Sequence, residues 1–183
     1  AKKKVIAAFA GDFVKAHRAG TEFLGKYARI SVPEADIVIT GNGGYPLDQN
    51  VYQSVKGMTT GEAVCRDGGV IILCASCSDG HGGESFYEHL SSALPEQILA
   101  DAATIPRDRT EPDQWEYQIL ARILAKHTVI MVTKDCDHKM LNEMHLCTAS
   151  SIAEALMQAF ELCGNDAKIA VIPDGVSVIA QKI

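Results

Sequence analysis

Short apolar runs, rich in β-branched side chains, alternate along the chain with stretches in which apolar residues recur at helical spacing. The first pattern is typical of buried strands and the second of amphipathic helices. We predict strands at residues 5–9, 37–39, 69–75, 128–133 and 168–172, with short extended pieces at 28–32 and 176–179. We predict helices at residues 12–26, 51–58, 60–65, 84–90, 94–102, 110–126, 139–144 and 150–162.

This alternation predicts an α/β fold of the Rossmann-like kind, with three layers: a mostly parallel sheet and helices on both faces. The 183 residues suffice for a single domain with its own core. Loops rich in glycine or aspartate follow the predicted strands, at residues 11–12, 41–48, 77–83, 134–138 and 173–175. Because the carboxyl ends of parallel strands meet at one edge of the sheet, these loops should build one functional edge.

The clearest strand–loop–helix unit runs from residue 36 to residue 58. Its loop contains Gly41, Gly43 and Gly44, which allow a sharp turn and the close approach of another group. Asp48 is our predicted N-cap, because its carboxylate can accept hydrogen bonds from the first turn of the helix. The loop lacks the G-x-G-x-x-G spacing, and no P-loop motif occurs in the chain, so a nucleotide cradle is disfavoured.

The helix behind this loop carries a polar face and an apolar face. At about 100° per residue, Tyr52, Gln53 and Lys56 fall within one narrow arc, close to the predicted ligand edge. A solvated helix face is the simpler interpretation of such residues, but the neighbouring glycine loop favours a binding site. The adjacent arc is predicted to be buried and contains Val51, Val55 and Met58.

Two other helices raise specific expectations. Thr110 is a predicted cap for the helix at 110–126, whose buried stripe should contain Trp115, Ile119 and Ile123. His17 lies in the middle of the first helix, and we expect it to be a packing histidine because no acidic or thiol partner is suggested nearby.

Charge and composition narrow the class of protein. The net charge of −6 argues against nucleic acid or an anionic membrane as the main partner. No apolar run approaches the roughly 20 residues of a membrane helix, and no signal peptide is visible. We therefore expect a cytoplasmic protein with buried free thiols. The start at Ala1 fits an excised domain as well as a processed protein.

Two local groupings could carry chemistry by themselves. Asp79 and His81 could form a metal pair or an acid–base pair, although a tight turn explains them nearly as well. Cys74 and Cys77 form a C-x-x-C motif, but it ends a strand where a redox pair would open a helix. A second such motif, which a zinc site would need, does not occur.

Four longer runs carry a resemblance to a known family: AGDFVKAHRAGTEF, ADIVIT with NGGYPLDQNVYQSVKGM, GGVIILCASCSDGHGGESFYEHL, and PDQWEYQILARILAKHTVIMVT. Together they resemble the carboxyl-terminal domain of nickel-pincer lactate racemases and related 2-hydroxyacid racemases. The similarity extends over about residues 5 to 175. It implies that residues 1–183 form one α/β domain of a two-domain enzyme, with the active site in the cleft between the domains.

The resemblance also implies an activity and a set of site residues. Family members interconvert the enantiomers of a 2-hydroxy acid by hydride removal and return, on a nickel-pincer nucleotide tethered to a lysine. By motif, Tyr52, Gln53 and Lys56 should face the cofactor and substrate. Lys56 would hold the substrate carboxylate or a nearby anion, Gln53 would hydrogen-bond substrate or cofactor, and Trp115 would be a wall of the pocket.

The tether, the nickel-binding histidine and the two acid–base histidines of the family belong to an amino-terminal domain that this chain lacks. We therefore expect the fragment alone to bind no nickel and to be inactive, with no catalytic or metal-binding residue of its own. Its partners would be a small 2-hydroxy acid and its own amino-terminal domain, and a homo-oligomer is left open. The alternatives are a non-catalytic small-ligand-binding or interaction domain and, more weakly, a thiol-redox domain that uses Cys74 and Cys77.

Overall fold

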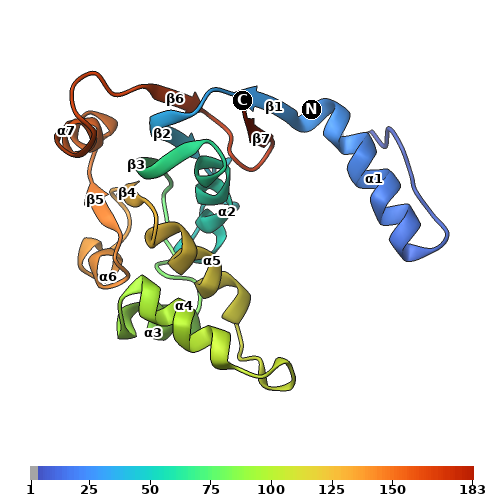
Figure 1. Ribbon diagram of the computed structural model, residues 1–183, viewed down its shortest axis with the longest axis horizontal. Helices are drawn as coiled ribbons and strands as arrows, with labels where there is room; N and C mark the ends of the chain where they lie inside the picture. Colours follow the sequence, from blue (N-terminus) through green and yellow to red (C-terminus); the bar gives the residue numbers. More distant parts are fainter. Residues whose placement is uncertain (1–3) are drawn as a thin grey trace.

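The computed structural model describes residues 4–183, and its centre is a five-stranded sheet in which every neighbouring pair is parallel (Figure 1). The strand order is β5-β4-β3-β2-β6, so the chain adds strands on one side of β2 and then crosses to the other side. The strands are β2 (Ala35–Gly41), β3 (Cys65–Cys74), β4 (Thr128–Val132), β5 (Cys147–Ala149) and β6 (Ile169–Ile172).

Helices cover both faces of this sheet, because alternate residues of each strand point to opposite sides. Val38 and Ile71 belong to the core shared with most of the helices, whereas Ile37 and Ile72 pack toward α7 (Ile152–Cys163). The predicted three-layer α/β class is therefore confirmed. The helices on the first side are α2 (Val51–Glu62), α3 (Glu84–Ser92), α4 (Pro95–Thr104), α5 (Gln114–Leu124) and α6 (His138–Glu143), with a 3-10 turn, η1, at Arg107–Arg109.

The amino-terminal region stands away from the sheet (Figure 1). Helix α1 (Phe13–Ala28) is capped by the Asp12 side chain, which accepts a hydrogen bond from the Lys15 amide at 3.0 Å. Behind α1, β1 (Arg29–Val32) pairs with β7 (Ile179–Lys182) in a small parallel sheet of two strands. The return strand therefore lies later than predicted.

The predicted first strand at residues 5–9 is wrong for this chain. Residues 4–10 form neither helix nor strand, and Val5 and Ile6 are 88% and 81% exposed. An apolar run becomes a strand only when a neighbouring strand accepts its hydrogen bonds, and no such neighbour is present among residues 4–183. His17 is exposed as well, so the prediction of a packing histidine is wrong.

Several element boundaries differ from the prediction. α2 runs without a break from Val51 to Glu62, and β3 begins at Cys65, earlier than the predicted strand at residues 69–75. α5 begins at Gln114, so Thr110 does not cap it. Of its predicted buried stripe, Ile123 is buried, but Trp115 is 55% exposed, whereas the next residue, Glu116, is 1% exposed.

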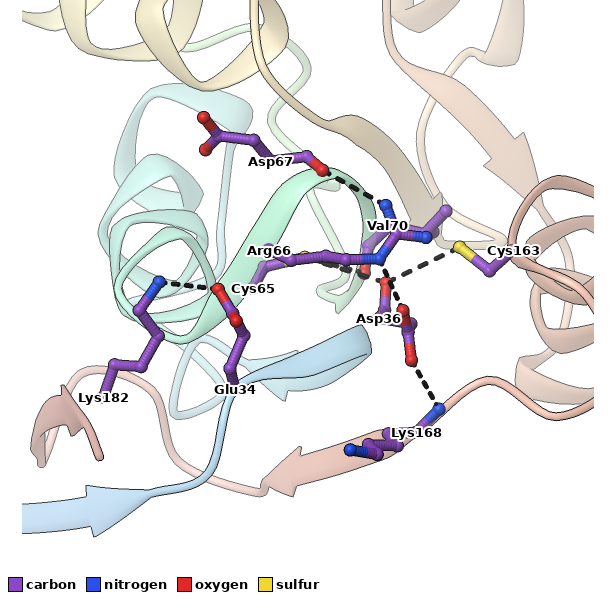
Figure 2. Close-up of polar contacts among 9 residues, drawn as sticks. All are labelled: Glu34, Asp36, Cys65, Arg66, Asp67, Val70, Cys163, Lys168 and Lys182. Carbon is purple, nitrogen blue, oxygen red and sulfur yellow. Dashed lines mark hydrogen bonds and ion pairs between the residues drawn. The ribbon is translucent and has the colours of Figure 1, made fainter.

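Asp36 ties three elements together at the amino end of the sheet (Figure 2). Its carboxylate accepts a hydrogen bond from the Arg66 side chain of β3 and another, at 2.8 Å, from the Lys168 amide beside β6. The Cys163 thiol at the end of α7 lies 3.6 Å from the Asp36 carbonyl oxygen. The Arg66 hydrogen bond is the main cause that lowers the pKa of Asp36, and the Lys168 amide lowers it further.

Asp36→Asn should lower the melting temperature of the domain at pH 7, because the charged acceptor of Arg66 is lost. Since the folded state lowers the pKa of Asp36 below its usual 3.8, its contribution is present above pH 3.8 and disappears as the pH falls through the lowered value. Calorimetry over a pH series should show the deficit shrinking in acid. Asp67→Asn is the matched control, since the Asp67 side chain is 83% exposed and lies 4.0 Å from Lys126. An equal effect of both substitutions would contradict the assignment.

Candidate functional site

The loops that follow β2, β3, β4 and β6 lie along the same edge of the sheet. The registers place Gly41 beside Cys74, and Cys74 beside Val132, at the ends of their strands. The prediction of one shared edge is confirmed for these loops. The loop at residues 11–12 does not belong to it, because it precedes α1 and follows no strand.

The buried amide of Asn42 fixes helix α2 against this edge. Its Nδ2 donates to the Leu47 carbonyl in the loop and, at 3.0 Å, to the Gln53 carbonyl in the helix. Its Oδ1 accepts from the Gly57 amide at 2.8 Å. Gly57 admits this contact because a Cβ atom there would lie only 3.0 Å from Oδ1. The loop and the first two turns of α2 are therefore held in one arrangement.

The amino-terminal end of α2 is fully engaged within the protein. The amides of Val51 and Tyr52 donate to the carbonyls of Gly80 and His81, at 3.0 and 3.1 Å. The Gln53 amide donates to the Asn50 side chain at 3.0 Å, so Asn50 is the N-cap. The prediction of Asp48 as cap is wrong, because its carboxylate accepts from the Ser76 amide at 3.1 Å. The free donors that bind an anion at a helix start are thus already used.

The four predicted site residues come together on neighbouring turns of α2 and α5. The Tyr52 ring packs edge-on against Trp115, with ring centroids 5.9 Å apart and planes at 89°. The Lys56 ammonium donates a hydrogen bond to the Gln53 side-chain oxygen. Tyr52 and Gln53 are half-buried, and Lys56 and Trp115 are exposed, so an ammonium, an amide and two aromatic rings share one accessible surface.

Burial controls the electrostatics of Tyr52. Loss of hydration is the main cause that raises its pKa, and the Asp113 carboxylate raises it further. The phenol therefore stays neutral and can donate or accept a hydrogen bond without supplying charge. Phe86 also packs edge-on against the Tyr52 ring, at a centroid distance of 5.3 Å.

Glu116 is a buried residue near Lys56 that the sequence reasoning did not single out. It is 1% exposed, and its Oε1 atom has no hydrogen-bond partner among the described residues. Burial raises its pKa to about 7, an effect that the nearby Lys56 charge opposes and the Asp113 charge reinforces. A signal was available, because Glu116 precedes the buried Leu120 and Ile123 by four and seven residues, which places a carboxylate in an apolar stripe.

The loop with Asp79 and His81 is engaged in local contacts. Asp79 accepts from the Asn50 side chain at 3.2 Å, and the His81 ring stacks on Tyr87 at a centroid distance of 5.1 Å. The ring nitrogen Nδ1 of His81 also accepts from the Gly83 amide at 3.2 Å. Within residues 4–183, no group of three or more His, Cys, Asp and Glu side chains is arranged to hold a metal ion.

The C-x-x-C motif has the wrong environment for thiol chemistry. Cys77 is completely buried, and burial raises its pKa to about 12, with Ser54 3.4 Å from the sulfur. Burial raises the pKa of Cys74 as well. A reactive cysteine needs a stabilised thiolate, so these two thiols fit a structural role.

Two cavities occur away from the four predicted residues. One of about 340 Å³ lies between α3, α4 and α5 and is lined in part by His89, Glu111 and Tyr117. The other, of about 220 Å³, is an apolar recess beside β6. None of the four predicted residues lines either cavity. Lys56 and Trp115 are exposed, so the surface that they share with Tyr52 and Gln53 is open to solvent.

Fold and geometry together define an α/β domain whose loops gather at the carboxyl edge of a parallel sheet. The comparison with protein families gives the particular family: residues 30–180 match the lactate racemase C-terminal domain. The chain belongs to that family.

Two curated relatives support this membership. The lactate racemase of Thermoanaerobacterium thermosaccharolyticum is 53% identical over 180 residues, and that of Lactiplantibacillus plantarum is 46% identical over 180 residues. Each match covers 98% of this chain but 42% of the relative. The chain therefore spans about two fifths of the length of these proteins.

Solved structures agree with the fold. The lactate racemase apoprotein from T. thermosaccharolyticum superposes with a TM-score of 0.89 at 54% identity, over 92% of this chain and 40% of that one. A crystal structure of a Thermotoga maritima protein gives a TM-score of 0.59 at 13% identity, over 93% of this chain and 43% of that one, and shows a likeness of fold alone.

Glu116→Gln should make the stability of the domain less sensitive to pH. The folded state raises the pKa of Glu116 from 4.5 to about 7. Ionisation of the buried carboxylate therefore lowers the stability of the fold; this loss is absent below pH 4.5 and complete above pH 7. The neutral glutamine removes that loss. Urea unfolding should therefore show equal stability near pH 4 and a variant more stable by up to about 3 kcal/mol at pH 8. Exposed Glu88 provides the control substitution, Glu88→Gln. A Glu116→Gln protein that is less stable than the parent chain at pH 8 would contradict this assignment.

Proposed function

We propose that this chain is the carboxyl-terminal, substrate-orienting domain of a nickel-pincer-dependent 2-hydroxyacid racemase or epimerase of the lactate type. Membership of the lactate racemase C-terminal domain family carries the proposal. The relatives are longer than this chain. Their additional amino-terminal part would complete the active site in a cleft between the two domains.

The exposed groups on α2 and α5 suit a small 2-hydroxy acid. Lys56 offers an ammonium that can pair with the substrate carboxylate, and Gln53, already bonded to it, limits the directions in which the ammonium points. The rings of Tyr52 and Trp115 provide an apolar wall at right angles to each other. Once a second domain closes over this surface, removal of water strengthens the ion pair.

The same surface does not fit the binding of the metal itself. Its donors are an ammonium, an amide, a phenol and an indole, whereas nickel sites in proteins prefer imidazole and thiolate ligands. We therefore assign to this chain the orientation of substrate and cofactor, and to the missing domain the tether, the nickel ligand and the acid–base histidines. When bound, the nickel-pincer nucleotide would accept the hydride and return it to either face of the substrate carbon.

The six cysteines are free, which supports the proposal of a reducing compartment such as the cytoplasm. Three of them, Cys65, Cys77 and Cys136, are buried, whereas Cys147 is exposed. No helix within residues 4–183 is both long enough and apolar enough to cross a bilayer.

Lys56→Ala in the complete protein should sharply reduce kcat/KM for racemisation. Loss of a desolvated partner of a carboxylate is worth on the order of 2–4 kcal/mol, which corresponds to a loss of about 30- to 1,000-fold. The complete reading frame should be expressed with the cofactor-producing enzymes, and chiral 2-hydroxy acids screened for loss of optical activity. The increase in KM should be the larger part, because the lysine binds carboxylate in the ground state too.

Lys126→Ala is the matched control, since Lys126 is also an exposed lysine but lies in the turn after α5, near Asp67 and away from the proposed site. It should leave kcat/KM unchanged. If Lys56→Ala lost thermal stability together with activity, the assigned role of Lys56 would be wrong. If the wild-type protein bound a 2-hydroxy acid without racemising it, the alternative of a non-catalytic ligand-binding domain would replace this proposal.

A further inference from the structure

Residues 4–28, which we call the arm, consist of an extended segment followed by α1 and carry an unusual amount of exposed apolar surface. Phe13 is 83% exposed, Tyr27 72% and Leu24 54%, in addition to Val5 and Ile6 in the extended segment. Only Gly25 and Ala28 of α1 are buried. Exposed apolar residues that cluster on one element mark an interaction surface.

The arm has a defined internal structure in spite of this exposure. The extended segment runs back along α1 (Figure 1), and its Phe9 ring packs on Phe23 at a centroid distance of 5.6 Å. The same ring lies over Gly20, where a Cβ atom would be 3.5 Å from it, an ordinary van der Waals distance. Phe23 in turn contacts Tyr27 at 5.2 Å. These contacts orient the segment and leave Val5 and Ile6 pointing outward.

The backbone of the extended segment has unused hydrogen-bonding capacity. Within residues 4–183, no hydrogen bond joins the backbone of residues 5–9 to any other segment. Val5, Ile6 and Phe9 of this segment are nevertheless of residue types that favour strands. A strand-like sequence with free donors and acceptors is suited to joining the edge of another sheet.

The family comparison separates the arm from the domain. The match to the lactate racemase C-terminal domain begins at residue 30, directly behind α1 and at the start of β1. The whole-chain relatives, in contrast, align over 180 of the 183 residues, so the arm is part of those proteins as well. Because the matched region is a carboxyl-terminal domain, the rest of each relative lies before it in the sequence. The arm is therefore the segment by which that remaining part reaches the domain.

We propose that the arm belongs to the fold of the amino-terminal part, with residues 5–9 adding a strand to its sheet and the apolar side of α1 packing on the same body. The partner surface is thus a sheet edge beside an apolar patch. The boundary between the two domains then lies at Ala28 and Arg29. This inference rests on the proposed function only in requiring the longer protein, and not on its racemase activity.

Hydrogen exchange read by mass spectrometry tests the strand directly. It should be measured on this chain and on the complete protein without cofactor, with the peptide that covers residues 5–9 as the reporter. Paired strand amides open only with their sheet, so exchange should be about 100-fold slower in the complete protein than in this chain. Equal exchange in both proteins overturns the proposal. Protection in this chain that grows with its concentration also overturns it, in favour of a second copy as occupant.

Substitutions in the complete protein test the packing of α1. Phe13→Asp should lower the melting temperature and restore fast exchange at residues 5–9, because a charge would be buried against the amino-terminal part. Met157→Asp on α7 is the matched control, since Met157 is 67% exposed and lies outside the arm. It should change neither readout. Equal effects of the two substitutions, or none from Phe13→Asp, overturn the proposal. Because no readout depends on turnover, an inactive enzyme would leave this test intact.

Discussion

The hydrogen bonds of a single buried amide determine where the candidate site lies. Asn42, 1% exposed, bridges the Gln53 carbonyl and the Gly57 amide, the two groups that an α-helix normally joins to each other. The same side chain holds the loop behind β2. Because the bridge fixes both the position and the rotation of α2, it also fixes the directions of Tyr52 and Lys56. A buried amide with all its partners in place tolerates little movement.

The second constraint is electrostatic. Helices α2 and α5 enclose Glu116 so tightly that its pKa rises to about 7, while the nearby Lys56 charge favours the ionised carboxylate. The exposed Lys56 ammonium and the buried Glu116 carboxylate are therefore close enough for their charges to interact. The buried carboxylate of Glu116 lowers the stability of the fold, as is common for residues at functional surfaces.

The distribution of apolar surface explains why the fold divides as it does. The five-stranded sheet and its helices bury two separate clusters of side chains, one on each face. The arm shares in neither cluster: Phe9, Phe23 and Tyr27 pack on one another, and Phe13 is exposed. A domain that satisfies its own core needs no further cover, whereas an arm of this kind gains stability only from another body. The surface of α2 and α5 is likewise exposed and has no cover of its own. Both the arm and this surface are suited to a longer protein.

The sequence alone determined much of this protein, because local periodicity reports the burial of each helix and strand. It predicted the α/β class, the alternation of elements, the buried side of α2 with Val51, Val55 and Met58, and a shared loop edge behind the strands. It placed the four proposed site residues by resemblance, and the structure brings them onto neighbouring turns.

Only the tertiary structure decided that Asn50 caps α2, since the carboxylate of Asp48 is used by Ser76, a residue of another loop. It also decided that residues 5–9 have no strand partner within residues 4–183 and that Glu116 is buried, because pairing and burial depend on segments far apart in the chain.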